Sequence, residues 1–120
     1  LMVYNFDLMT TGPMLYEEGI LETNTDIHAG EGETSKMLVI APEAVHMDKA
    51  VDFVPTTPRS YLNYGPILRF CPDGVWGQAT LGTAEKGERI LTRTAEIGVE
   101  EMNKAFAFME SKEKLNYSYF

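Results

Sequence analysis

With 120 residues, the chain is long enough for one domain with a modest core. Hydrophobic residues make up 44% of it and charged residues 23%, which is typical of a globular protein and excludes a disordered or fibrous one. The formal net charge of −8 disfavours binding to nucleic acid or to an anionic membrane surface, and no apolar run approaches the roughly 20 residues that cross a bilayer.

The first seven residues are predicted to form a strand that is buried on both faces. The run Leu1-Met2-Val3-Tyr4-Asn5-Phe6 is apolar from its first residue, whereas a free chain terminus is usually polar and frayed. We therefore expect the chain to be part of a larger fold. Residues 10–13 are predicted to end the strand in a turn, and residues 14–27 to form a short helix followed by a loop.

A short apolar helix is predicted to begin after Gly30 and to end near Ile40. Glu31 and Glu33 lie in its first turn, where the helix dipole favours acidic side chains. Pro42 disfavours a helical conformation at the residue before it, and we expect it to start another turn. Because so short a helix is not stable by propensity alone, we expect it to be buried on most sides.

Residues 51–80 hold four of the six prolines and the only tryptophan. We expect this stretch to be irregular, with a short strand at 51–54 and several turns. The longest helix is predicted from the N-cap candidate Thr83 to about Lys112. Apolar residues recur along it at helical spacing: Ile90, Leu91, Ile97, Met102, Ala105, Phe106 and Met109.

His28 has the most informative surroundings for chemistry. It is followed by Ala29 and Gly30, whose small size lets the backbone and the imidazole approach a ligand closely. A histidine near its ordinary pKa of about 6.5 can donate or accept a proton at neutral pH. Glu33 could bind a divalent metal or orient a metal ligand. The alternative is a polar loop whose Asp, Thr and Ser residues merely cap the helix, and the residues alone give the two interpretations equal weight.

The other residues with potentially reactive or binding side chains are interpreted mainly as structural. His46 is interpreted as a surface or packing residue, and Trp76 as part of a core. Cys71 is a weak candidate nucleophile; as the single cysteine it excludes an internal disulfide and suits a cytoplasmic location. A metal hydrolase needs about three protein ligands, and the sequence has no His-x-His or His-x-Glu pair. We therefore expect the chain to be chemically incomplete on its own.

Two segments of the chain resemble one known family. Residues 28–38 read HAGEGETSKML and are followed by APEAV at 41–45. This is similar to the His-Ala-Gly-x-x-Glu-Thr-Ser-x-Met-Leu … Pro-Glu-x-Val signature of the creatininase (creatinine amidohydrolase) family. Downstream, GVWG at 74–77 and EKG at 85–87 resemble the element that precedes the last helix of that family. The first match is the more specific one, because several residue types recur in register.

The resemblance implies an α/β fold in layers, with a central, mainly parallel sheet flanked by helices, and assembly into homo-oligomers. It implies hydrolysis of C–N bonds (cyclic amide, formamide-type or peptide) at two divalent metal ions such as zinc, manganese or iron. Most metal ligands of the family lie in its amino-terminal half, which nothing in this chain matches. Residues 1–120 therefore resemble the carboxy-terminal portion of a single domain. Its partner would be the amino-terminal half, on another chain or missing.

The resemblance also implies roles for single residues. His28 matches the active-site histidine of the family, which binds the substrate and transfers a proton. Glu33 matches the signature glutamate, the one metal ligand supplied by this half. Asn24 and Thr25 fall where substrate-contacting residues of creatininase lie, although Asn24 is not the tryptophan found there, so the substrate stays open. The alternative hypothesis is a non-catalytic interaction domain that keeps the fold without the metal ligands.

Overall fold

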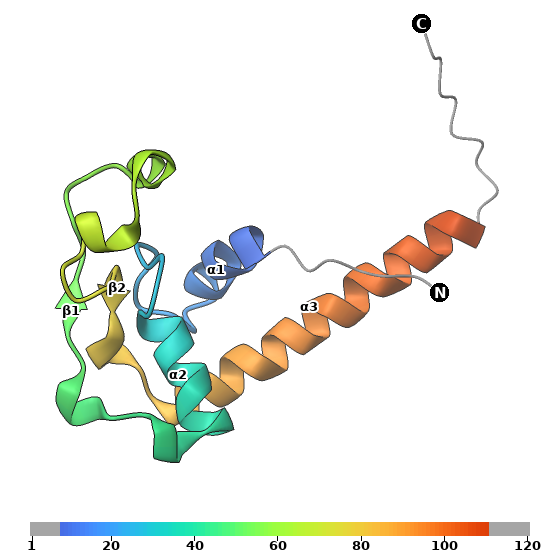
Figure 1. Ribbon diagram of the computed structural model, residues 1–120. Helices are drawn as coiled ribbons and strands as arrows, with labels where there is room; N and C mark the ends of the chain where they lie inside the picture. Colours follow the sequence, from blue (N-terminus) through green and yellow to red (C-terminus); the bar gives the residue numbers. More distant parts are fainter. Residues whose placement is uncertain (1–7, 111–120) are drawn as a thin grey trace, which may run out of the picture.

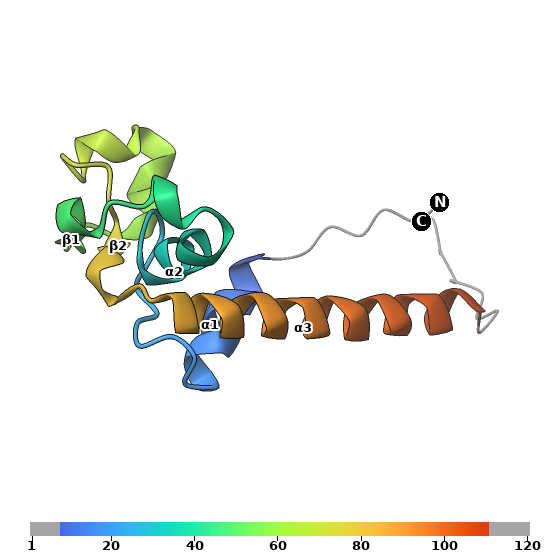
Figure 2. The same cartoon turned by 90° about the horizontal axis from the view of Figure 1, so that it is seen from below.

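Three α-helices form most of the regular structure: α1 (Leu8–Glu17), α2 (Glu31–Ile40) and α3 (Ala84–Glu110). The computed structural model describes residues 8–110, with side chains from Thr11 onward. Both α1 and α2 lie beside the amino-terminal half of α3, whereas the other half of α3 extends away from them (Figures 1 and 2). The radius of gyration is 18.1 Å, compared with about 13 Å for a compact domain of 100 residues. The projecting helix therefore gives the protein an elongated shape.

The sheet of the described region consists of two short antiparallel strands, β1 (Asp52–Phe53) and β2 (Gly77–Gln78). The predicted mixture of helix and strand is thus present, but the predicted mainly parallel sheet is not formed by the described residues. The irregular chain between β1 and β2 folds back on itself, which suits an antiparallel pair, whereas parallel strands are usually joined by a crossover helix. The strand predicted at residues 1–7 lies outside the described residues.

Helix α1 runs through Pro13, where the sequence predicts a turn, so this prediction is wrong. A proline inside a helix removes one main-chain hydrogen bond. The helix ends instead at Glu17. Gly19 follows with a φ of +68°, and the Ile20 N–H donates to the Leu15 carbonyl oxygen at 2.9 Å in a Schellman motif. Leu15 and Ile20 are thereby packed against Ile90 of α3. The packing of Leu15 and Ile20 on α3 compensates for the hydrogen bond lost at Pro13. Local sequence signals alone cannot show this compensation.

Helix α2 has the predicted bounds, but it is not buried on most sides. Its buried residues among the described side chains are Glu31 and Ser35, whereas Met37 and Ile40 are 40% and 63% exposed. One of the contacts that hold the helix is a close approach to α3. A Cβ atom placed on Gly87 would lie 2.1 Å from the Ser35 carbonyl oxygen. The apolar side of α2 is therefore left uncovered by the part of the chain that the structure describes.

Helix α3 begins where the sequence predicts. The Lys86 N–H donates to Thr83 Oγ1 at 3.2 Å, which confirms Thr83 as the N-cap. The fully buried members of its apolar stripe are Ile90 and Ile97. Near its end, Phe106 and Met109 are 50% and 67% exposed. The helix reaches Glu110, and the predicted end near residue 112 lies outside the described residues.

Between α2 and α3 the chain is mostly irregular, as its prolines predict. Short 3₁₀ segments occur at Pro42–Ala44, Met47–Lys49, Arg59–Tyr64, Ile67–Arg69 and Ala79–Leu81. The predicted turn at Pro42 and the predicted strand around Asp52 are both present. Among residues 8–110, no helix combines the length and the apolar character that crossing a membrane requires.

Candidate functional site

The main chain of His28 is fixed to that of Trp76, and its imidazole is exposed. The Trp76 N–H donates to the His28 carbonyl oxygen at 2.9 Å, and the Trp76 carbonyl oxygen accepts from the N–H groups of His28 (3.1 Å) and Ile27 (2.8 Å). Trp76 itself is 3% exposed, which confirms its interpretation as a core residue. Trp76, which immediately precedes β2, thus anchors the backbone of His28 and leaves the imidazole accessible.

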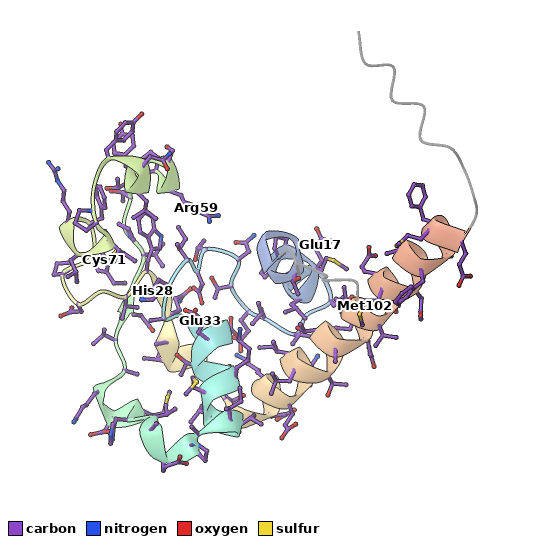
Figure 3. All side chains as sticks on the ribbon, turned by 45° about the vertical axis from the view of Figure 1, so that its right-hand side comes forward. Glu17, His28, Glu33, Arg59, Cys71 and Met102 are labelled. Atoms are coloured by element: carbon purple, nitrogen blue, oxygen red, sulfur yellow. The ribbon has the colours of Figure 1, made fainter. Side chains whose placement is uncertain are left out.

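Glu33 folds back over the turn that leads from His28 into α2. Its carboxylate Oε2 accepts a hydrogen bond from the Ala29 N–H. Ala29 has a φ of +54°, a conformation that residues other than glycine rarely adopt. Figure 3 shows His28 and Glu33 near each other at the start of α2, far from Glu17 on α1. Glu33 therefore stabilises the turn that follows His28, and it remains accessible at the surface.

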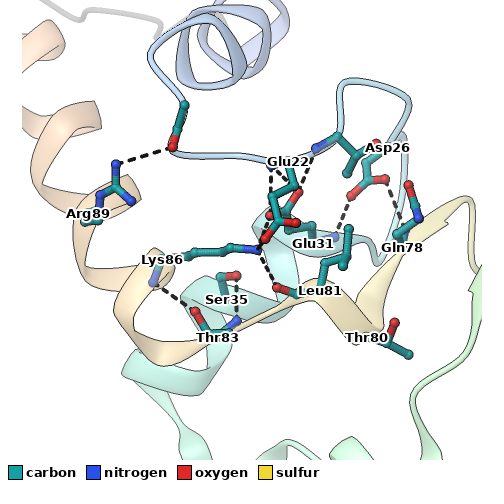
Figure 4. A network of polar contacts seen from close by, with 12 residues as sticks. Glu22, Asp26, Glu31, Ser35, Gln78, Thr80, Leu81, Thr83, Lys86 and Arg89 are labelled. Atoms are coloured by element: carbon teal, nitrogen blue, oxygen red, sulfur yellow. Dashed lines mark hydrogen bonds and ion pairs between the residues drawn. The ribbon is translucent and has the colours of Figure 1, made fainter.

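Asp26 connects α2 to β2. Its hydrogen bond to the start of α2 is the capping that the alternative interpretation predicts, whereas its hydrogen bond to β2 was not predicted. Its Oδ2 accepts from the Glu31 N–H at 2.5 Å, and its Oδ1 accepts from the Gln78 N–H at 3.1 Å (Figure 4). The second partner is 52 residues away in the sequence. The only local signal for this role is an acid a few residues before a helix, which is typical of helix starts in general.

Glu31 has a fully buried side chain whose carboxylate is surrounded by donors. It accepts from the N–H groups of Glu22 (3.1 and 3.0 Å) and Thr23 (3.0 Å), and from Lys86 Nζ at 2.6 Å (Figure 4). Lys86 Nζ also contacts Glu22 Oε1 at 2.6 Å and the Leu81 carbonyl oxygen at 2.8 Å. Burial lowers the pKa of Lys86, but its hydrogen bonds to the two carboxylates outweigh this and raise it. This ion pair fixes the start of the loop 22–30.

The two predicted substrate-contacting residues lie on the same loop as His28. Asn24 and Thr25 are both exposed. Thr25 is held by Thr23, whose Oγ1 accepts from the Thr25 N–H at 3.2 Å and lies 2.8 Å from Thr25 Oγ1. Loop 22–30 therefore presents an amide, a hydroxyl and an imidazole from a segment that Glu31 and Asp26 hold at its two ends.

The described residues do not fit a metal ion by themselves. In residues 8–110, no three His, Cys, Asp or Glu side chains come together as a possible metal site. A protein metal centre usually has about three protein ligands. Glu33 offers a single carboxylate, one oxygen of which is already engaged by the main chain. Any metal near Glu33 would need further donors from elsewhere.

The remaining candidates have no place in this site. Cys71 is buried, and burial raises the pKa of its thiol, so it is a poor nucleophile. His46 is exposed between two 3₁₀ segments. A shallow hollow of about 310 Å³ lies on another surface and does not include His28. Its lining residues are Ile20, Glu88, Arg89, Thr92, Arg93 and Glu96.

Comparison with known proteins identifies the family. The sequence model of the creatininase family, described as creatinine amidohydrolase, matches residues 2–102. A creatinine amidohydrolase of Pseudomonas putida is 38% identical over 79 residues. The matched stretch covers 64% of this chain and 30% of that protein. No solved structure matches. The chain belongs to the creatininase family, and the family resemblance of its His28 and Glu33 segment is thereby confirmed.

Proposed function

We propose that this chain is part of a metal-dependent amidohydrolase that cleaves a C–N bond in a small-molecule amide. The observation that carries the proposal is the arrangement at His28, whose backbone is anchored to Trp76 while its imidazole is exposed beside Glu33. Membership of the creatininase family supports it, and the Pseudomonas putida relative is named for the hydrolysis of creatinine.

In this proposal Glu33 provides one donor to a centre of zinc, manganese or iron. The other donors come from polypeptide outside residues 8–110, namely the amino-terminal half of the domain or a partner chain. The same polypeptide completes the parallel sheet of the layered fold, and the whole assembles as a homo-oligomer. The exposed apolar residues of α2 support such a covering, since they are only partly packed by the described chain.

His28 is the residue that moves the proton in this proposal. Hydrolysis of an amide forms a C–O bond between water and the carbonyl carbon and breaks the C–N bond, and a proton lost by the water must reach the departing nitrogen. An imidazole can accept a proton and deliver it to that nitrogen at neutral pH. The hydrogen bonds to Trp76 fix the backbone from which the ring projects. Asn24 and Thr25 offer an amide and a hydroxyl to orient the substrate on the same loop.

The test compares two histidines of the same chain. We expect His28→Ala to lower kcat by about 10²- to 10⁴-fold, the usual contribution of a general acid or base. His46→Ala should leave kcat unchanged, because His46 is exposed away from this loop. The assay uses the complete protein with creatinine, a formamide and a short peptide, and thermal unfolding checks that both variants fold. Near wild-type activity in His28→Ala would remove this residue from the mechanism.

Metal content separates the proposal from the interaction-domain alternative. We expect Glu33→Gln to bind less metal than the wild type, because the amide is a poorer ligand than the carboxylate. The matched control is Glu43→Gln, which changes an exposed acid in a 3₁₀ segment. If the complete wild-type protein contains no divalent metal and hydrolyses none of the three amides, the alternative of a non-catalytic interaction domain is correct.

A further inference from the structure

We propose that Asp26 is a positioning residue, whose carboxylate ties the start of α2 to β2 and so holds the turn that carries His28. The proposal rests on the proposed function of His28. In this proposal Asp26 acts on the site through the backbone and needs no contact with the substrate or a metal. Three observations support it. Both oxygens of the Asp26 carboxylate accept a main-chain hydrogen bond, and two glycines leave room for the carboxylate. The segment that Asp26 binds in β2 also bonds the His28 backbone through Trp76.

The two carboxylate oxygens of Asp26 bind two separate elements. The Glu31 N–H, in the first turn of α2, has no acceptor within its own helix. The N-cap residue Gly30 has no side chain to supply one. Asp26 Oδ2 takes this role at 2.5 Å, while Oδ1 holds the Gln78 N–H of β2 at 3.1 Å. One carboxylate therefore caps α2 and fixes its distance from β2.

Gly30 and Gly77 leave the space that this carboxylate occupies. A Cβ atom on Gly30 would lie 2.0 Å from Asp26 Oδ2, and one on Gly77 would lie 2.7 Å from Asp26 Cγ. A Cβ on Gly77 would also lie 2.7 Å from the Gly30 Cα. Neither glycine is among those with positive φ, so both are needed for room rather than for conformational freedom. The site is built around the Asp26 side chain.

The connection to His28 runs through the main chain. Trp76 bonds the His28 backbone, and two residues later Gln78 bonds Asp26. Segments 26–28 and 76–78 are thus joined by hydrogen bonds at both of their ends. Ala29, directly after His28, is held at a φ of +54°, and such a conformation persists only where its surroundings impose it. Releasing Asp26 would free β2 from α2 and loosen this turn.

The Asp26 carboxylate is half-buried and lies near other acidic groups. Burial raises the pKa of Asp26, and the negative charges of Glu31 and Asp52 act in the same direction. The two main-chain hydrogen bonds favour the ionised form but do not outweigh burial.

Asp26→Asn tests the tether with almost no change in size. The asparagine has one acceptor oxygen, and its amide nitrogen would face a backbone N–H donor. In the complete folded protein without substrate, we expect amide hydrogen exchange at His28, Glu31 and Gln78 to become about tenfold faster or more. In the activity assay, we expect kcat to fall by about 10- to 100-fold, with KM changed by less than about twofold.

The control is Asp48→Asn, an exposed acid in a 3₁₀ segment, which should change neither exchange nor kcat. Gly30→Ala is the second variant, because its Cβ must displace the Asp26 carboxylate, and we expect the same pattern. It replaces Asp26→Asn if that variant does not fold.

Unchanged exchange at all three amides would overturn the proposal. So would faster exchange with unaltered kcat in an enzyme that His28→Ala inactivates. Full activity of His28→Ala would reject the proposed function instead, and the exchange measurement would still decide whether Asp26 holds the turn.

Discussion

At the residue scale, the buried carboxylate of Glu31 requires a partner for each of its oxygens. Main-chain N–H groups of Glu22 and Thr23 and the ammonium group of Lys86 provide them. The Lys86 side chain is only 14% exposed, so this ion pair lies largely away from solvent. In the sequence, Glu31 is simply an acid in the first turn of a helix. Its partner lies 55 residues away, and no local pattern marks that pairing.

Removing the ammonium group should be costly. We expect Lys86→Met to lower the free energy of unfolding by about 3 kcal/mol, because it leaves a buried carboxylate without its counter-charge. The matched control is Lys104→Met, which breaks an ion pair with Glu101 whose side chains are 69% and 42% exposed. That change should cost less than about 1 kcal/mol. Urea unfolding measures the free energy of unfolding of both variants. Equal decreases in the two variants would show that water screens the ion pair between Lys86 and Glu31.

At the element scale, α2 and α3 cross through small residues. Gly87 lies against the Ser35 carbonyl group, and the Thr83 N–H donates to Ser35 Oγ at 3.1 Å. The first helical residues of α3 are thereby fixed to the middle of α2. Since α2 also carries Glu33 and follows the His28 turn, this crossing sets where the candidate site stands relative to α3.

A methyl group at the crossing should separate the two helices. We expect Gly87→Ala to lower the free energy of unfolding by about 2 kcal/mol, since the added Cβ meets backbone rather than a movable side chain. Gly32→Ala in the first turn of α2 places its Cβ in ordinary contact with the Leu21 side chain, at 3.6 Å, and should instead raise it by up to about 1 kcal/mol. Thermal and urea unfolding would check both signs. A stabilised Gly87→Ala would mean that the helices do not need this close approach.

Elements with strong local signals were predicted well. The Thr83 N-cap marks the start of α3, and Pro42 marks the end of α2. Helix α1 was misplaced because Pro13 is a strong turn signal, and only the packing of Leu15 and Ile20 on α3 overrides it. The burial of α2 was also predicted wrongly, because the hydrophobicity of a short segment does not say what covers it.

At the scale of the whole molecule, large apolar side chains remain exposed on several elements. They include Met37, Ile40, Tyr64, Leu68, Phe106 and Met109. Extended apolar surfaces usually mark contacts with other polypeptide. The projecting half of α3 contributes two of these residues and lies away from α1 and α2 (Figure 2). This supports the proposal that the chain works inside a larger assembly.

We therefore expect the isolated chain to self-associate. Light scattering coupled to size exclusion should give a mass above the 13.5 kDa of one chain, rising with concentration. Phe106→Gln combined with Met109→Gln should shift the mass towards the monomer, because it removes apolar surface from the projecting half of α3. A folded monomer of wild-type sequence at every concentration would contradict this prediction.

The sequence by itself determined the family, the end of α2 and the start of α3, because these depend on residues close together in the chain. The tertiary structure decided the rest. It bound His28 to Trp76, gave Asp26 two partners and placed Lys86 on Glu31. Except for the bond between Asp26 and Glu31, those contacts join residues about 50 apart or more, and they exist only after α2, β2 and the start of α3 have packed together.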